Sequence, residues 1–148
     1  MPTYTKAVDF IGDMGKGVHD LSSDNLIIVL SNTAPASESS NPLTVGNGVI
    51  ANITPISYTN YTDNLTVDRR LENVTWTESG GTWTLNADDV VMTGSGGDIA
   101  AFQYIYICND TATGDPVIGL FTLDAAETVT DGSDLTITIN ASGIYGAS

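Results

Sequence analysis

The side chain best suited to acid–base chemistry in this sequence is its single histidine, His19, which is followed directly by Asp20. A histidine beside a carboxylate can take the proton from a Ser, Cys or Thr nucleophile. No Gly-x-Ser-x-Gly motif accompanies the pair, and neighbouring His and Asp residues are common on protein surfaces. We therefore interpret His19 and Asp20 as a surface pair and expect that the protein is not an enzyme.

The other candidate reactive groups are a lone cysteine and several polar turns. Cys108 is the only cysteine, so an intrachain disulfide is impossible, and its apolar neighbours favour a small buried hydrophobe. The segment 131–134 (DGSD) lacks the ligand order of an EF-hand calcium loop. The segment 94–97 (GSGG) lacks the Lys and the helix of a phosphate-binding loop. We expect no catalytic, cofactor-binding or metal-ligating residues, and leave open a calcium or magnesium ion on clustered loop carboxylates.

The charge balance limits the possible partners. Eighteen acidic residues against four basic ones give a net charge of −14. Binding to nucleic acid or to an anionic membrane needs clustered cations, so we expect neither partner. The one basic pair, Arg69-Arg70, is interpreted as a surface pair bonded to Asp68 or Glu72.

The elements that must position these residues are β-strands, which dominate the second half of the chain. Between Thr82 and Asp124, four apolar or alternating stretches are separated by turn-forming segments, and they predict strands over 83–85, 90–92, 99–108 and 116–123. The stretch 100–108 is apolar or aromatic at nearly every position. Both of its faces must therefore be covered, by another layer of the fold or by a partner subunit.

Further strands and turns are predicted on either side of this region. Gly80-Gly81 joins Val74–Trp76 to Trp83–Leu85 as a hairpin with both tryptophans on one face. The remaining predictions are strands over 26–30, 49–56 and 135–139, a turn over 124–127, and packing of Ile144 and Tyr145 against a sheet edge. The predicted fold is all-β: a single antiparallel β-sandwich or flattened barrel of Greek-key or jelly-roll type, one domain over residues 1–148.

Two segments have weak patterns of their own. Residues 1–17 are expected to form an arm or a short helix, with Val8, Ile11, Phe10 and Met14 on one side and glycines that weaken it. Residues 31–48 form a long loop rich in Ser, Pro and Asn. Loops of this length are usually functional or ordered by a partner. We expect both segments to contact other subunits.

The chain resembles a family of small virion proteins of tailed bacteriophages, the capsid decoration or cement proteins. The resemblance covers most of the chain in scattered blocks and is strongest from Ala87 to Gly119. The blocks are 17–21, 23–24, 30–35, 87–90, 96–99, 102–104, 106–111 and 115–119. It implies a structural protein on the outer surface of the capsid, made in the host cytoplasm, which binds the major capsid protein and stabilises the lattice. It also implies a symmetric oligomer, first a homotrimer and second a dimer.

The alternative function is a receptor- or carbohydrate-binding module of a phage tail or fibre. Such a module would use exposed aromatic rings as stacking platforms, and the candidates are Tyr58, Tyr61, Trp76 and Trp83. It requires at least one exposed ring beside polar groups. A capsid-binding protein requires exposed apolar surface on its arms or flank instead.

Overall fold

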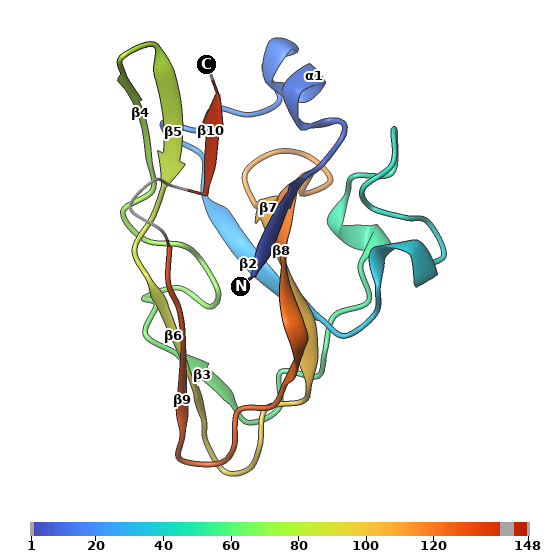
Figure 1. Ribbon diagram of the computed structural model, residues 1–148, viewed down its shortest axis with the longest axis vertical. Helices are drawn as coiled ribbons and strands as arrows, with labels where there is room; N and C mark the ends of the chain where they lie inside the picture. Colours follow the sequence, from blue (N-terminus) through green and yellow to red (C-terminus); the bar gives the residue numbers. More distant parts are fainter. Residues whose placement is uncertain (1, 140–143, 148) are drawn as a thin grey trace.

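Antiparallel strands dominate the folded chain, as the sequence predicts, with one short α-helix among the described residues (Figure 1). The computed structural model describes residues 2–139 and 144–147. The strands are β1 (Thr3–Lys6), β2 (Leu26–Ser31), β3 (Tyr61–Asp63), β4 (Thr75–Ser79), β5 (Thr82–Asn86), β6 (Val90–Gly94), β7 (Phe102–Asn109), β8 (Val117–Glu127), β9 (Asp134–Ile137) and β10 (Tyr145–Ala147). The helix is α1 (Phe10–Gly15), and two 3₁₀ turns are η1 (Pro35–Ser37) and η2 (Ile50–Asn52).

Four strands form the main sheet, in the order β1-β8-β7-β2, with all neighbours antiparallel. β7 and β8, which are consecutive in the sequence, pair with each other over most of the length of β7. The predicted turn over 124–127 is wrong, because β8 continues to Glu127, which lies opposite Phe102 beyond an irregularity in register. The last four residues of β8 are exposed, so polar and small side chains are tolerated there without a turn. β7 begins at Phe102, and the preceding Ile99 is buried in a loop.

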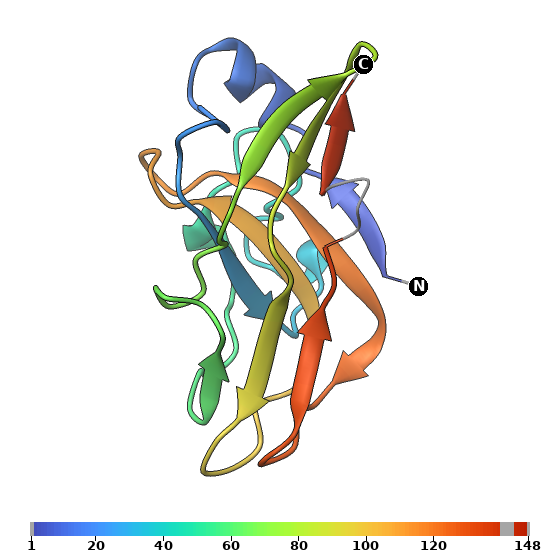
Figure 2. The same ribbon diagram turned by 90° about the vertical axis from the view of Figure 1, so that its left-hand side faces the viewer.

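The second layer consists of two three-stranded sheets, β10-β5-β4 and β3-β6-β9. Figure 2 looks onto this layer, with the main sheet behind it. Leu85, Val90 and Met92 of the second layer are fully buried in the same core cluster as the main-sheet residues. The two layers form the predicted antiparallel sandwich, with the second layer divided into two parts.

Several predictions about the second layer are confirmed. The β4–β5 hairpin places Trp76 and Trp83 together on one face. β9 ends at Ile137, yet Leu135, Ile137 and Ile139 are all at least half-buried, as the alternation predicts. Beyond the undescribed residues 140–143, Ile144 is buried and β10 pairs with the edge of β5.

The main sheet is covered on both faces, as the composition of β7 requires. Successive side chains of a strand point to opposite faces, and Ile105, Tyr106, Ile107 and Cys108 are all buried. The second layer covers one face, and in Figure 1 the long connection from β2 to β3 lies on the other side of the sheet. The second cover is therefore supplied by the chain itself.

This connection, residues 32–60, runs from the end of β2 to the start of β8 and then returns to β2, an edge strand of the main sheet. At the start of β8, Val117 N–H donates to Gly48 O over 2.8 Å. At the β2 edge, Ile56 N–H donates to Leu30 O over 2.9 Å, and Ser31 Oγ donates to Thr54 O over 2.6 Å. The Glu38 carboxylate joins the outgoing and returning arms by accepting from Thr54 N and Oγ1 over 2.8 and 2.7 Å. Residues 31–48 are thus packed within the subunit over part of their length.

The predicted strand over 49–56 is absent from this connection. Residues 50–52 form the turn η2 instead. Of the alternate residues that would share one face of such a strand, Val49, Ala51, Ile53 and Pro55, only Ile53 is buried. The segment pairs with the main sheet only at isolated positions, such as Val49 opposite Pro116. Without a continuous partner strand, apolar alternation alone does not produce a strand.

The N-terminal segment is an integral part of the sandwich. β1 forms the edge strand beside β8, with Thr3 opposite Thr122, so the expectation of an arm is wrong for residues 3–6. The expected helix is present as α1. Its inward face is Phe10, which is fully buried, whereas Val8 and Ile11 are 57% and 45% exposed. The single aromatic ring takes the inward position because it removes the largest apolar area from water.

Close backbone approach at Gly94 yields a stability prediction. A Cβ added to Gly94, the last residue of β6, would lie 2.6 Å from Thr130 O, a backbone atom. We predict that Gly94→Ala lowers the free energy of unfolding by about 1–3 kcal/mol, measured by urea denaturation. Gly12 in α1 is the matched control, since nothing lies within 4 Å of its added Cβ. Gly12→Ala is expected to raise stability by roughly 0.5 kcal/mol, and equal effects of the two substitutions would contradict the packing argument.

Candidate functional site

The two segments expected to contact partners meet at one end of the molecule. The Asp9 carboxylate, just before α1, accepts a hydrogen bond from Gly46 N–H of the loop over 2.7 Å. Gly48 also packs against Asp9, with its hypothetical Cβ 3.5 Å from Oδ2. A charge-assisted bond of this kind fixes the loop turn against the start of the helix.

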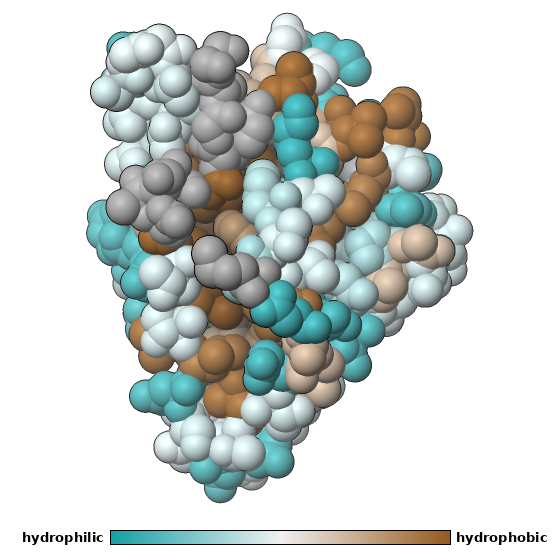
Figure 3. Space-filling model, in the orientation of Figure 1, coloured by the Kyte–Doolittle hydropathy of each residue, from teal (hydrophilic) through white to brown (hydrophobic). Residues whose placement is uncertain are grey.

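Three aliphatic side chains are exposed beside this contact. Val8 and Ile11 flank Asp9 on the helical side, and Val45 precedes Gly46 on the loop side, where it is 74% exposed. We call Val8, Ile11 and Val45 the aliphatic patch. Figure 3 shows hydrophobic side chains gathered at the upper end of the molecule, over α1 and the neighbouring loop. Of the five large hydrophobic residues that are exposed in the described structure, three belong to this patch.

The backbone beneath the patch is held by buried side chains and hydrogen bonds. Phe10 and Ala7 are buried, and Ala7 N–H donates to Ile118 O of β8 over 2.9 Å. On the loop side, Leu43 N–H donates to Asn41 Oδ1 over 2.9 Å and Asn52 Nδ2 donates to Asn47 O over 2.8 Å. The exposed aliphatic groups therefore stand on backbone that is held by internal hydrogen bonds.

His19 lies inside the protein, so its interpretation as a surface residue is wrong. It is 6% exposed, with its ring centroid 5.3 Å from that of Phe10. Asn109 Nδ2 lies 3.0 Å from His19 Nδ1 and donates to Asp24 Oδ2 over 2.6 Å. Asn109 Oδ1 accepts from Thr111 N and Ala112 N, which fixes the orientation of the amide. His19 Nδ1 is consequently a hydrogen-bond acceptor, and the ring is neutral with its proton on Nε2.

The geometry does not join His19 to Asp20. The Asp20 carboxylate accepts hydrogen bonds from Ser22 N and Ser22 Oγ, and these bonds lower its pKa. Asp24, which sequence reasoning missed, is the carboxylate connected to His19 through Asn109. Because Asp24 follows His19 by five residues and Asn109 is distant in sequence, no local motif signals this network. It ties the 18–25 segment to the end of β7.

Two of the four candidate stacking rings have structural roles. Tyr58 Oη accepts from Leu30 N–H over 2.9 Å, and the Arg69 guanidinium lies 4.0 Å above its ring. Tyr61 donates to Asp63 Oδ2 over 2.9 Å. Burial is the main cause that raises the pKa of both phenols. Both rings are half-buried, so neither offers an open platform.

The two tryptophans form a separate feature on the β4–β5 hairpin. Their ring centroids lie 5.5 Å apart at an interplanar angle of 21°, which is a stacked arrangement. Trp83 is 44% exposed and Trp76 is half-buried.

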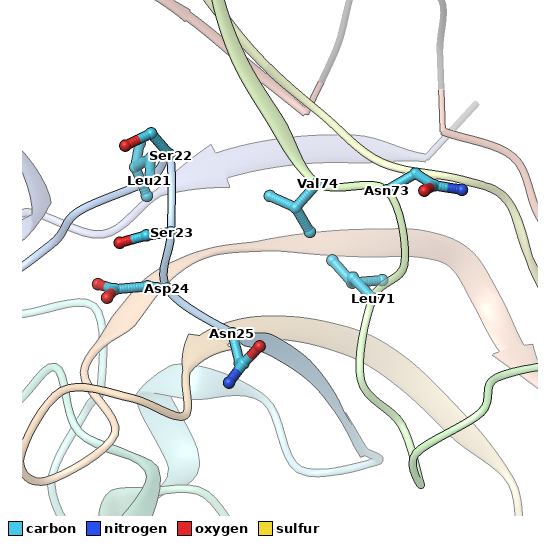
Figure 4. A pocket seen from close by; sticks show the side chains of 8 residues that line it. All are labelled: Leu21, Ser22, Ser23, Asp24, Asn25, Leu71, Asn73 and Val74. Carbon is cyan, nitrogen blue, oxygen red and sulfur yellow. The ribbon is translucent and has the colours of Figure 1, made fainter.

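A shallow depression lies between the base of β4 and the 21–25 segment (Figure 4). It is lined mainly by the polar residues Ser22, Ser23, Asp24, Asn25 and Asn73, together with Leu21, Leu71 and Val74.

The remaining sequence candidates have unreactive settings. Cys108 is fully buried, and burial raises the pKa of its thiol, which disfavours the thiolate. Arg69 pairs with Asp68 over 2.6 Å, as expected, whereas Arg70 pairs with Asp110 over 3.5 Å instead of Glu72. Asp131 accepts from Gly96 N–H and Asp134 from Thr93 Oγ1, so these turn carboxylates fasten loops. The described residues include no group of three or more His, Cys, Asp and Glu side chains placed to hold a metal ion.

A helix with the length and apolarity required for crossing a membrane is not found among the described residues. The chain matches no protein-family model, no curated protein and no solved structure.

The buried His19 network predicts a pH dependence of stability. Burial is the largest cause that lowers the pKa of His19, partly offset by Asp13 and Asp24. In the unfolded chain His19 takes a proton near pH 6.5, while the folded protein holds the ring neutral to lower pH. The free energy of unfolding should therefore fall as pH drops from 7 to 5, by at most about 1.4 kcal/mol per pH unit. The substitution His19→Gln removes this contribution of the histidine. The variant's free energy of unfolding, measured by urea denaturation at each pH, should therefore change less with pH than that of the wild type. Identical slopes would contradict the prediction.

Proposed function

We propose that this protein is a virion structural protein of a tailed bacteriophage, a capsid decoration or cement protein. It binds the major capsid protein on the outside of the lattice and stabilises the shell. The observation that carries the proposal is the aliphatic patch, where the two segments expected to contact partners meet and expose three apolar side chains on fixed backbone. The proposal also draws on the sequence blocks that resemble this family.

The physical properties of the chain support this role. A net charge of −14 favours solubility of free copies and opposes their non-specific aggregation. The fold needs no disulfide, since its only cysteine is buried. The patch is small, and a small apolar contact suits a protein that binds as an oligomer, because linked copies engage several identical lattice sites at once. As part of the same proposal, the bound copies form a symmetric oligomer, first a homotrimer and second a dimer.

The test is binding of purified protein to capsids that lack it, by co-sedimentation, followed by resistance of the particles to heat. We predict saturable binding that protects the shell. Combined substitution of Val8, Ile11 and Val45 by Ser should weaken binding by about tenfold or more, because each exposed aliphatic group loses roughly 1 kcal/mol of burial. Deletion of residues 1–17 is a poorer test, since it also removes β1 and the buried Phe10.

Val67 provides a matched control for these substitutions. It is 45% exposed, equal to Ile11, and lies outside the patch. Val67→Ser should leave capsid binding unchanged, and both variants should unfold within about 1 kcal/mol of the wild type, since exposed substitutions have small effects. Failure to bind capsids, or equal losses in the patch and control variants, would contradict the proposal.

The second candidate function is a receptor- or carbohydrate-binding module of a phage tail or fibre. The observation that favours it is the stacked pair Trp76 and Trp83, because Trp83 is the most exposed large aromatic side chain of the four stacking candidates. Sugars stack their apolar faces on such rings. This function predicts binding on a glycan array that is lost in Trp83→Ala, together with location at the tail of the particle. Capsid binding without glycan binding would exclude it.

A further inference from the structure

The outer edge of β4, in the β4–β5 hairpin, has no neighbouring strand in the part of the chain that the structure describes. Gly80 and Gly81 form its two-residue turn with φ of 62° and 85°, as a type I′ turn requires. The residues that flank such a turn, Ser79 and Thr82, form a hydrogen-bonded pair. Hydrogen-bonded and non-hydrogen-bonded pairs then alternate along the antiparallel ladder. The backbone N–H and C=O of Trp76 and Glu78 therefore point away from β5. No other hydrogen bond to these groups occurs within the part of the chain that the structure describes.

This edge differs from the β2 edge of the main sheet, which the chain covers itself. Ile28 N–H donates to Arg69 O, and Leu71 N–H donates to Leu26 O, over 2.9 and 2.8 Å. β4 contains no Lys and no Pro, its one charged side chain is Glu78, and its pairing with β5 is regular. Four of its five residues are exposed. An uncovered, regular edge of this kind is a template for another strand.

Charge favours a second copy of this chain at the edge. Residues 73–87 carry a single charged side chain, Glu78, in a protein with a net charge of −14. Two copies repel each other over most of their surfaces, and the hairpin is where they can approach with the least repulsion. The exposed side chains on one face of β4 are Thr75, Thr77 and Ser79, which are neutral and small.

We propose that two copies of the protein pair through β4, antiparallel about a two-fold axis at Thr77, into a six-stranded sheet with the order β10-β5-β4-β4-β5-β10. In this register Trp76 of each copy lies opposite Glu78 of the other, and each such pair exchanges both backbone hydrogen bonds. The two Glu78 carboxylates are thus not directly opposed. Thr77 faces its own symmetry mate as a non-hydrogen-bonded pair, the type in which side chains are closest.

This inference deepens the proposed self-association in its second form, the dimer, and rests only on that part of the proposed function. It assigns the interface to the hairpin, remote in sequence from the aliphatic patch, and it makes the two-fold dimer the state of the free protein. The interface is isologous, so it closes at two copies.

The experiment is sedimentation velocity of the purified full-length protein over a concentration series, with charge variants at the two-fold axis. Wild type should show a reversible monomer–dimer equilibrium. Thr77→Lys and Thr77→Glu each place two like charges directly opposite each other, and each should weaken dimerisation by about tenfold or more. An equimolar mixture of the two variants should restore dimers, with a dissociation constant within about threefold of wild type, because Lys then faces Glu.

The mixture separates a lost interface from a lost fold, since misfolded variants cannot rescue each other. Thr113 on the β7–β8 loop is exposed and makes no hydrogen bond that involves its side chain in the described structure, so Thr113→Lys and Thr113→Glu serve as matched charge controls that should dimerise like wild type. A monomer at all concentrations, a closed trimer, or Thr77 variants that dimerise normally would each overturn the proposal. Because the assay contains no capsids, its failure is distinguishable from failure of the capsid-binding function.

Discussion

The structure depends on the need to cover both faces of the main sheet. β7 and its neighbours are buried on each side, so a single packed layer would leave a large apolar face in water. The second layer of strands covers one face, and residues 32–60 cover the other without forming a sheet. Residues 32–60 form almost no continuous backbone hydrogen-bond ladder with the sheet that they cover. Its position is fixed by individual bonds, such as those of Glu38 to Thr54 and of Asp9 to Gly46.

This mode of attachment explains why the exposed apolar groups lie where they do. A connection held at separate points buries the side chains between those points and leaves the turns outside. Val45 lies in such a turn, and Val8 and Ile11 lie beside the carboxylate that holds it. Residues 1–17 and 31–48, whose sequence patterns were weakest, are therefore held by hydrogen bonds and expose aliphatic side chains beside those bonds. For the proposed capsid contact, such preorganisation would cost less conformational entropy on binding than a flexible arm would.

The sequence was sufficient for the fold class and for most strands, and insufficient for the site. Alternation, turn residues and apolar runs located most strands, since these signals are local. They failed at residues 49–56, where no partner strand is available, and at 124–127, where β7 provides one. The burial of His19 and the Asp9–Gly46 contact depend on residues distant in sequence, so no local pattern could predict them. The choice of Phe10 over Val8 as the inward side chain depends likewise on the space beneath the helix.

The pairing of β1 with β8 has a consequence for how the protein is made. Thr3 pairs with Thr122, and Leu26 pairs with Asn109, so the first two strands find their partners only near the end of the chain. On the ribosome the N-terminal third must wait, unpaired, until β7 and β8 have emerged, and long-range contacts of this kind make folding slow. During that interval the apolar stretch Leu26–Leu30 is exposed. The net charge of −14 opposes association of such incomplete chains, because like charges repel.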